Sequence, residues 1–394
     1  MNSTPKGEVR TPAPAQPGLL RSMNNRVVLD LFIERGSLSR GDVHELTGLS
    51  KPTASQLLVR LEESGLVLPG GFGETGPGGR APQLYRLNPL AGNAAAVDVR
   101  PESIHARVCD IAGAIVAEYE LTEISTPRGV QNVAHALERA CALADIAIGD
   151  LQGIVVGVPG SYDAAADILR YAEHLDGWQE PGIGEALRAQ LGGAAVALEN
   201  DVNLVALAEQ RASGSTDETF FLLWLGEGIG GALMIDGSLF RGSRGAAGEA
   251  AFLLPPGSRI VDRDRTTGGF EDLVGADSLR KLAAAAGHDE ASWLQSLVAL
   301  LADPAASDTV QEIARRYALG LASVIALVDP ARIILAGELA TIGGTRLRDA
   351  VAAELDALVL AAPPLDLAAA GTSPILDGAM LRSLDLARER VFTT

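Results

Sequence analysis

Three consecutive polar residues, Glu199, Asn200 and Asp201, stand where an apolar run meets a helical pattern. The run, residues 194–198, is typical of a buried strand, and apolar side chains at helical spacing follow Asp201. A polar group at such a junction lies at the carboxyl edge of a sheet, where open α/β folds bind small molecules. The triplet therefore predicts a small-molecule site.

A glycine-rich segment follows the triplet and could bring backbone amides close to a phosphate. Residues 220–225 and 232–235 are typical of the two strands of a β-hairpin, and four glycines fall in the turn expected over 226–231. Glycine lets backbone N–H groups approach an anion closely. Taken alone, the glycines are equally consistent with a tight hairpin that binds nothing.

The elements that must position these residues fit an α/β protein. A chain of 394 residues is long enough for two or three domains, and 47% hydrophobic but only 4% aromatic residues favour packed α/β layers over an all-β sandwich. No apolar run reaches the length of a membrane span, and the N-terminus lacks the apolar core of a signal peptide. Cys109 and Cys141 have no nearby partner for a disulfide or metal motif. We expect a cytoplasmic protein without a membrane partner.

The charge is unevenly distributed along the chain. The formal net charge is −18, but residues 1–18 and residues 19–90 each carry about +1, which leaves −20 for residues 91–394. Because local charge decides a contact, a near-neutral N-terminal head on an acidic body can still bind DNA. Residues 1–18, rich in Pro, Thr and Ala, are predicted to be a disordered arm.

Residues 19–90 predict a winged helix-turn-helix domain. An apolar face over residues 23–32 indicates a first helix, in which Met23, Val27 and Leu31 share one spacing. Ser39 with Asp42 is a variant of the capping box that opens a second helix. Ser50 caps a third helix, after which residues 66–68 and 83–87 are expected to pair as the two strands of a wing.

The third helix exposes polar and basic residues and contains no acid before Glu62. Its N-terminal residues would face base edges in the major groove, and an arginine at the wing tip would meet the minor groove or a phosphate. The predicted DNA-binding residues are Lys51, Thr53, Ser55, Gln56, Arg60 and Arg80. The alternative is a winged helix used for protein contacts or dimerisation.

The stretch from residue 198 to 252 resembles the ROK family (repressors, open reading frames, kinases), sugar-kinase relatives of the actin-like ATPases. The resemblance rests on the Asn200-Asp201 pair after a strand, on the glycine-rich hairpin over 225–231, and on Gly248-Glu249. In the head, LTGLSKPT and the Gly-Gly-Arg wing match ROK repressors, whereas ROK sugar kinases usually lack such a domain. The resemblance implies a winged helix-turn-helix followed by a two-lobed, actin-like (ribonuclease H-like) ROK domain over 91–394.

The nucleotide-binding elements that the resemblance implies are damaged. Family kinases follow an Asp with a Gly-Gly-Thr turn, but Asp98 is followed by VRPES over 99–103, which lacks glycine and contains a proline and an acid. Glu227 replaces a small hydroxyl residue of the hairpin, and the turn at Gly337 keeps one of two usual glycines. We therefore predict no enzyme activity. Asp201 would be the general base only if the protein were a kinase.

The resemblance also implies a carbohydrate site, because amide and carboxylate groups donate to and accept from vicinal hydroxyls. The candidate ligand residues are Asn200, Asp201, Glu249, Glu271, Gly160 and His174. Each acid taken singly is equally typical of a helix cap or a solvated loop, Gly160 of a plain turn, and a lone His of a structural residue. Phe252 stands where the family has a His that touches the sugar, so an unusual effector or a site without a ligand is compatible with the sequence.

The zinc ligands of the family are not matched. Zinc-binding members use one His and three Cys, and the equivalent positions by spacing from Glu249 are Phe252, Asp262, Asp264 and Gly269. Phe and Gly cannot ligate, and two carboxylates make a poor zinc site. We predict no metal and no cofactor, with the loop held by packing of Phe252 and Phe270.

Together these features predict a transcriptional regulator. The head would read double-stranded operator DNA, and a carbohydrate effector bound in the degenerate kinase cleft would release it. A homodimer or homotetramer is expected, because helix-turn-helix proteins bind paired half-sites. The alternatives are an active ROK sugar kinase with an appended DNA-binding head, and a ligand-independent DNA-binding regulator.

Overall fold

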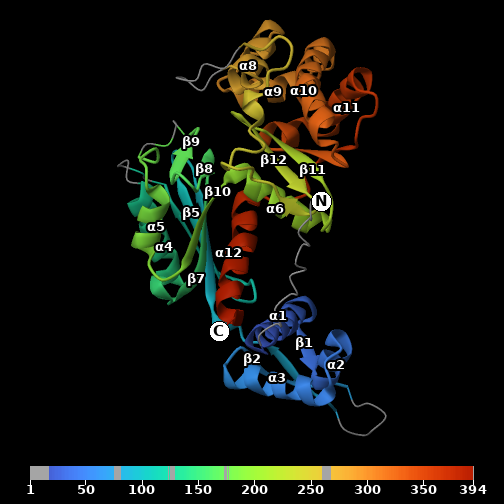
Figure 1. Cartoon of the computed structure of the whole chain (residues 1–394). Helices are drawn as coiled ribbons and strands as arrows, with labels where there is room; N and C mark the ends of the chain where they lie inside the picture. The colour runs from blue at the N-terminus through green and yellow to red at the C-terminus, as the bar shows by residue number, and fades with distance from the viewer. Residues whose placement is uncertain are drawn as a thin grey trace, which may run out of the picture.

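The computed structural model describes residues 17–74, 81–122, 124, 129–172, 175, 177–259 and 268–393, and for residues 17–22 only the backbone. Three parts follow one another along the molecule: a small head, a first α/β lobe and a second α/β lobe (Figure 1). The C-terminal helix α12, Pro374–Thr393, runs from between the lobes to the head. No helix among these residues is both long enough and apolar enough to cross a membrane.

The head is a winged helix-turn-helix, as predicted. Its three-stranded sheet has the order β1-β3-β2 and packs against three helices. The capping box is confirmed: the Ser39 hydroxyl accepts the Asp42 N–H at 3.2 Å, and the Asp42 carboxylate accepts the Ser39 N–H at 2.7 Å. The elements are α1 (Pro17–Arg35), β1 (Ser37–Ser39), α2 (Arg40–Thr47), α3 (Lys51–Glu63), β2 (Val67–Phe72) and β3 (Gln83–Leu87).

Two details of the head differ from the sequence prediction. Helix α1 begins at Pro17, inside the segment expected as an arm, whose residues 1–16 lie outside the described residues. The apolar face was wrong at its start, because Met23 is 57% and Val27 50% exposed, whereas Val28, Leu29 and Phe32 are buried. Val28, Leu29 and Phe32 therefore define the face of α1 that enters the core.

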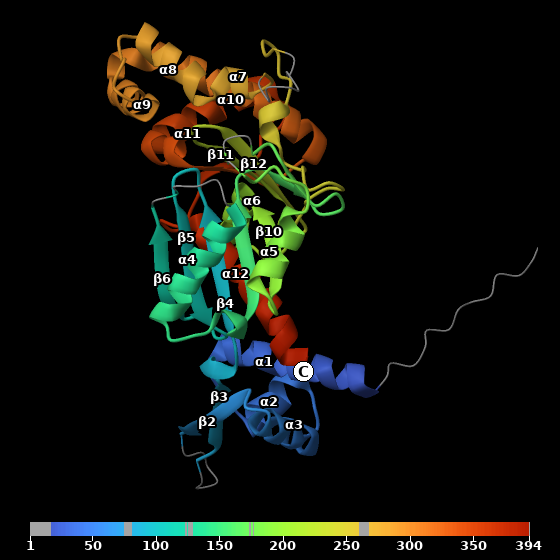
Figure 2. The same ribbon diagram turned by 90° about the vertical axis from the view of Figure 1, so that its left-hand side faces the viewer.

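The first lobe is a five-stranded sheet of order β10-β7-β4-β5-β6. Helices α4 (Gly129–Leu143) and α5 (Ile183–Leu191) cover one face, and Figure 2 shows them in front of the sheet with α12 behind it. Strand β7 is apolar along its length because both faces are covered. The strands are β4 (Asn93–Val99), β5 (Ile104–Asp110), β6 (Ile115–Leu121), β7 (Leu151–Val158) and β10 (Ala195–Asn200), with a small hairpin of β8 (Ser161–Asp163) and β9 (Ile168–Arg170) beside them.

The second lobe repeats this topology with the order β13-β12-β11-β14-β15. In both sheets three antiparallel strands are followed by two parallel strands, which is the ribonuclease H-like pattern expected from the family resemblance. The strands are β11 (Phe220–Leu225), β12 (Ile229–Ile235), β13 (Ser238–Leu239), β14 (Arg332–Ala336) and β15 (Leu365–Leu367). The helices on its outer face are α7 (Glu271–Val274), α8 (Ala276–Ala285), α9 (Trp293–Ala302), α10 (Ser307–Val328) and α11 (Glu338–Leu358).

The turn of the β11–β12 hairpin is shorter than predicted. Gly230 and Gly231 lie inside β12, paired with Trp224 and Leu223, so only residues 226–228 form the turn. A Cβ on Gly231 would collide with the carbonyl of Gly248, so this glycine lets the segment before Glu249 approach the backbone of β12 closely.

Helix α6, Asp201–Ser213, connects the two lobes. Leu204 packs with α12 in the core of the first lobe, whereas Val205 packs against the second sheet. A Cβ on Gly378 of α12 would collide with the carbonyl of Leu204, so the two helices are in backbone contact. At its other end α12 packs against α1, and one hydrophobic core runs from the head into the first lobe.

Candidate functional site

The strand β10 passes directly into α6, and Asn200 is the N-cap of that helix. Its Oδ1 accepts the Asn203 N–H at 2.9 Å, as capping requires. Its Nδ2 donates to the carbonyl of Gly160 and to Asp201 Oδ1, both at 3.0 Å. Because both amide hydrogens are used, Asn200 positions its neighbours and offers a ligand only its remaining lone pair.

Gly160 lies in the turn after β7 with φ 104, a conformation that favours glycine. A Cβ there would also collide with the carbonyl of Arg170 on the neighbouring β9 strand. The Asn200 side chain thus ties this turn to the N-terminus of α6. The structure brings together Gly160, Asn200 and Asp201, as the sequence reasoning expected of a site at the sheet edge.

Three carboxylates, Asp98, Asp201 and Glu249, form an acidic cluster around the N-terminus of α6. Burial raises the pKa of Asp201 to about 7, and the negative charges of Asp98 and Glu249 add to that shift. The N–H of Val202 donates to Asp201 Oδ1 at 2.8 Å, and this hydrogen bond opposes the rise in pKa. Burial also raises the pKa of Glu249 to about 7. Near neutral pH this cluster can both donate and accept protons in hydrogen bonds to hydroxyl groups.

Asp98 was noted in the sequence but not expected among the ligand residues. Asp98 is 1% exposed, and its carboxylate forms an ion pair with Arg100, in which Asp98 Oδ2 lies 2.8 Å from Arg100 Nη2. Burial raises its pKa even though Arg100 opposes the shift. Its second oxygen is buried without a hydrogen-bond partner among the described residues. A polar residue at the end of a central strand is the sequence signal that could have identified it.

Glu271 lies at the β11–β12 hairpin. The N–H of Ile229 donates to its carboxylate at 2.9 Å, and burial raises its pKa, with Asp272 and Glu227 contributing. Gly228 lies next to the carboxylate, since a Cβ there would be in ordinary contact with both of its oxygens at 3.9 Å. Its described hydrogen bond is therefore to the hairpin, and a direct link to Asn200 or Asp201 stays a prediction.

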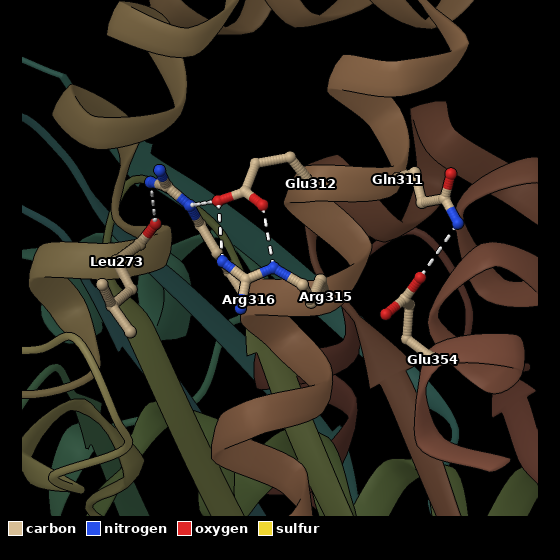
Figure 3. Close-up of polar contacts among 6 residues, drawn as sticks. All are labelled: Leu273, Gln311, Glu312, Arg315, Arg316 and Glu354. Carbon is tan, nitrogen blue, oxygen red and sulfur yellow. Dashed lines mark hydrogen bonds and ion pairs between the residues drawn. The ribbon is translucent and has the colours of Figure 1, made fainter. Parts of the chain in front are cut away.

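The short helix that holds Glu271 is anchored by α10. Arg316 Nη1 donates to the carbonyl of Leu273 and to the Ser278 hydroxyl, both at 3.1 Å, while its Nε donates to Glu312 at 2.8 Å (Figure 3). Arg315 also donates to Glu312, through Nε at 2.9 Å and Nη2 at 3.1 Å, but among the described residues it has no hydrogen bond to α7 (Figure 3). Arg316 is thus the side chain that joins Glu312 to the backbone of α7.

Aromatic packing also holds the segment that carries Glu271, as predicted for Phe270. Phe270 is fully buried, with its ring edge-on to Tyr317 at 6.2 Å between centroids. Phe252 packs elsewhere, against Tyr171 at 4.8 Å. Phe252 and Gly269 provide no metal-binding atoms at the zinc positions, so the described part of this segment does not fit a zinc ion. Asp262 and Asp264 lie outside the described residues.

The predicted DNA-binding residues lie on the outer face of α3. Lys51, Thr53, Gln56 and Arg60 are exposed and Ser55 is half-buried, while the apolar positions face the core of the head. The Thr53 hydroxyl is 2.8 Å from that of Ser50, so it is partly used in capping. Arg80, and likewise His174 of the proposed ligand site, lie outside the described residues.

Two ribonuclease H-like lobes connected by α6, with a cluster of buried carboxylates at its N-terminus, define an actin-like, sugar-kinase-like body, here joined to a winged helix-turn-helix. Residues 94–378 match the profile of the ROK family, and residues 27–69 match that of the IclR helix-turn-helix domain. The chain belongs to the ROK family.

Similar proteins include both regulators and kinases. A putative xylose repressor of Caldicellulosiruptor sp. (strain Rt8B.4) is 24% identical over 349 residues, 84% of this chain and 87% of that protein. The solved structure of a ROK family transcriptional regulator, a homologue of the E. coli MLC protein, has a TM-score of 0.72 at 18% identity and covers 95% of this chain and 99% of its own. The structure of the ROK hexokinase from Thermus thermophilus has a TM-score of 0.62 at 28% identity. The match covers 74% of this chain and 97% of the hexokinase chain.

Proposed function

We propose that this ROK family member is a DNA-binding repressor of sugar-metabolism genes, and that a sugar or sugar derivative releases it from its operator. The observation that supports this most is the union of a winged helix-turn-helix with a sugar-kinase-like body through α12. One relative, whose alignment with this protein covers most of both chains, is named a putative xylose repressor. A pentose or hexose is therefore the first effector class to test.

The release mechanism follows from the position of α6. Its N-terminus holds Asn200 and Asp201, and its body packs against α12, which ends at the head. A ligand that draws the lobes together would shift α6 relative to the first sheet, and α12 with it. In a dimer that binds paired half-sites, such a shift changes the spacing of the two recognition helices and lowers the population able to bind DNA.

We infer that the body does not transfer phosphate. Arg100 stands where a flexible glycine turn would approach the nucleotide, and its guanidinium pairs with Asp98. Glu227 and Glu271 lie at the hairpin turn, where two carboxylates repel phosphate. The second candidate function, a sugar kinase with an added head, is favoured by the retained Asp201 and by kinase relatives such as the Thermus hexokinase.

One pair of measurements separates these functions. Fluorescence anisotropy with DNA from beside the gene, at one stated salt concentration, should show specific binding that Lys51→Ala weakens and Arg348→Ala, on distant α11, does not. A coupled assay of ADP release with D-xylose, D-glucose and N-acetylglucosamine should show no sugar-dependent turnover. Turnover without DNA binding would establish the kinase instead.

We further propose a homodimer or homotetramer that acts in the cytoplasm, where its DNA target lies. Two copies are needed because a single head contacts only one half-site. Sedimentation of the full chain with and without operator tests this, since a monomer bound singly to DNA would contradict it.

A further inference from the structure

A groove lined by arginines lies beside α12. Asp98, Asp201 and Glu249 are not among its lining residues, although its smaller cavity reaches Asn200 at the N-terminus of α6. Two neighbouring cavities of about 540 and about 310 Å³ share Arg241 and Arg382 in their walls. Arg211, near the end of α6, lines the larger cavity, and Arg188, near the end of α5, lines the smaller one. We call these two cavities with their four arginines the arginine groove.

The charges of the arginine groove are only partly balanced, because its walls hold two carboxylates, Glu199 and Asp385, beside the four guanidinium groups. Arg241 is paired with Glu199 at 2.6 Å, and Arg188 lies 3.9 Å from Asp167. Arg211 and Arg382 form no ion pair within 4 Å among the described residues, but Arg382 interacts with Asp385 and opposes the rise that burial causes in the pKa of this carboxyl. The body carries a net charge of −20 over residues 91–394, so four arginines around one hollow depart from its general character.

We propose that the arginine groove binds a small metabolite that carries a phosphate monoester. Guanidinium groups bind phosphate oxygens through two parallel hydrogen bonds, and the cavity volumes are in the range of small-ligand sites. The acidic cluster of Asp98, Asp201 and Glu249 repels a dianion, so it selects uncharged sugars. The body thus has two sites of opposite charge, one for a neutral sugar and one for a phosphorylated compound.

The groove is placed to influence the head. Arg382 is on α12, between the lobes and the contact with α1, and Arg241 precedes Glu249 in the segment that returns to the cleft. A phosphate held by both arginines would fasten this segment to α12. Occupancy of the groove would then change how readily α12 moves when the cleft closes.

Thermal unfolding and calorimetry with D-glucose 6-phosphate, inorganic phosphate and D-glucose test the proposal on the full chain. We expect the two phosphate compounds to raise the melting temperature of the wild type, because a ligand of the folded state stabilises it. Arg382→Gln combined with Arg211→Gln should weaken their binding roughly tenfold or more, since at least one charge-assisted hydrogen bond is lost. Arg348→Gln, whose guanidinium is already paired with neighbouring Asp349, is the matched control.

Asp201→Ala separates the groove from the cleft. It should leave binding of inorganic phosphate and D-glucose 6-phosphate unchanged, because the four arginines are intact and Asn200, which lines the smaller cavity, keeps its bond to Gly160. If no phosphate compound binds the wild type, or if the double variant binds as tightly as the control, the proposal is overturned. Loss of phosphate binding in Asp201→Ala would assign the compounds to the cleft and overturn it as well. DNA binding is not used in this test, so its outcome is independent of the repressor function.

Discussion

The guanidinium of Arg26, on α1 of the head, lies over the ring of Phe392 on α12, 5.7 Å from its centroid. Phe392 is only 1% exposed and belongs to the core that also contains Val28, Leu29 and Phe32 of the head. The C-terminal helix of the body is therefore part of the packing of the DNA-binding domain. A movement of α12 cannot leave the head unaffected.

Replacing Phe392 should uncouple the head from the body. Phe392→Leu keeps an apolar side chain but loses the ring and its cation–π contact, at an expected cost of about 1 kcal/mol. Operator affinity should stay within a few-fold of the wild type, because α3 is untouched, while the sugar-induced decrease in that affinity becomes smaller. Anisotropy titrations with and without effector measure both quantities. An unchanged effector response would show that α12 does not transmit the signal.

Asp201→Asn should stabilise the protein at alkaline pH. The pKa of Asp201, raised to about 7 by burial and by Asp98 and Glu249, means that the folded state holds a proton that the unfolded chain releases at lower pH. Stability is therefore lost as pH rises from about 4 towards 7, and the neutral amide avoids that loss. We expect a melting temperature a few degrees higher than wild type at pH 8, and little difference at pH 4. A variant that is less stable than wild type at pH 8 would contradict the raised pKa of Asp201 in the acidic cluster.

Asn200→Ser should separate helix capping from site positioning. Serine keeps an acceptor for the Asn203 N–H, so the capping energy changes by no more than about 1 kcal/mol. It cannot donate to both Gly160 and Asp201, so the turn after β7 loses its tether. Calorimetric titration should show weaker sugar binding in a protein whose melting temperature is close to wild type. Equal affinity would mean that Asn200 serves α6 alone.

Arg316→Ala should loosen α7 and with it the position of Glu271. The variant loses the bonds to Leu273 and Ser278, each worth about 1 kcal/mol or more, whereas Arg315→Ala loses only a contact with Glu312. Hydrogen exchange should therefore become faster in residues 268–280 and at Ile229, whose N–H donates to Glu271. The matched Arg315→Ala variant should exchange like the wild type in both segments. Equal exchange in the two variants would remove Arg316 from this role.

Local signals in the sequence were sufficient for most elements of the fold. Ser39 with Asp42, and Ser50 before Pro52, mark helix starts through hydrogen bonds made within four residues, so they can be read without a structure. The polar triplet at 199–201 was likewise correctly placed at a strand-to-helix junction. The error at Met23 and Val27 arose because several faces of α1 are apolar, and its packing against the rest of the head and α12 decides which one is buried.

Relationships between distant segments could not be predicted in the same way. Even the local pair of Arg100 and Asp98, two residues apart, depends on the geometry of the turn after β4, which a pattern of residue types does not contain. Arg316 reaches α7 across 43 residues, and Arg382 lines the same cavities as Arg241 because α12 packs against α6. Such contacts depend on tertiary packing, so the sequence supplies candidates and the structure supplies their partners.

The central claim, that a sugar in the cleft and DNA on the head oppose each other, is tested most directly by measuring both affinities reciprocally. The dissociation constant for operator DNA is determined with and without saturating sugar, and that for sugar with and without saturating DNA, at one salt concentration. Linkage requires that the two ratios be equal, and we predict a weakening of about 5- to 150-fold in each direction. If the sugar binds and neither ratio differs from one, the body does not regulate the head and the account is contradicted.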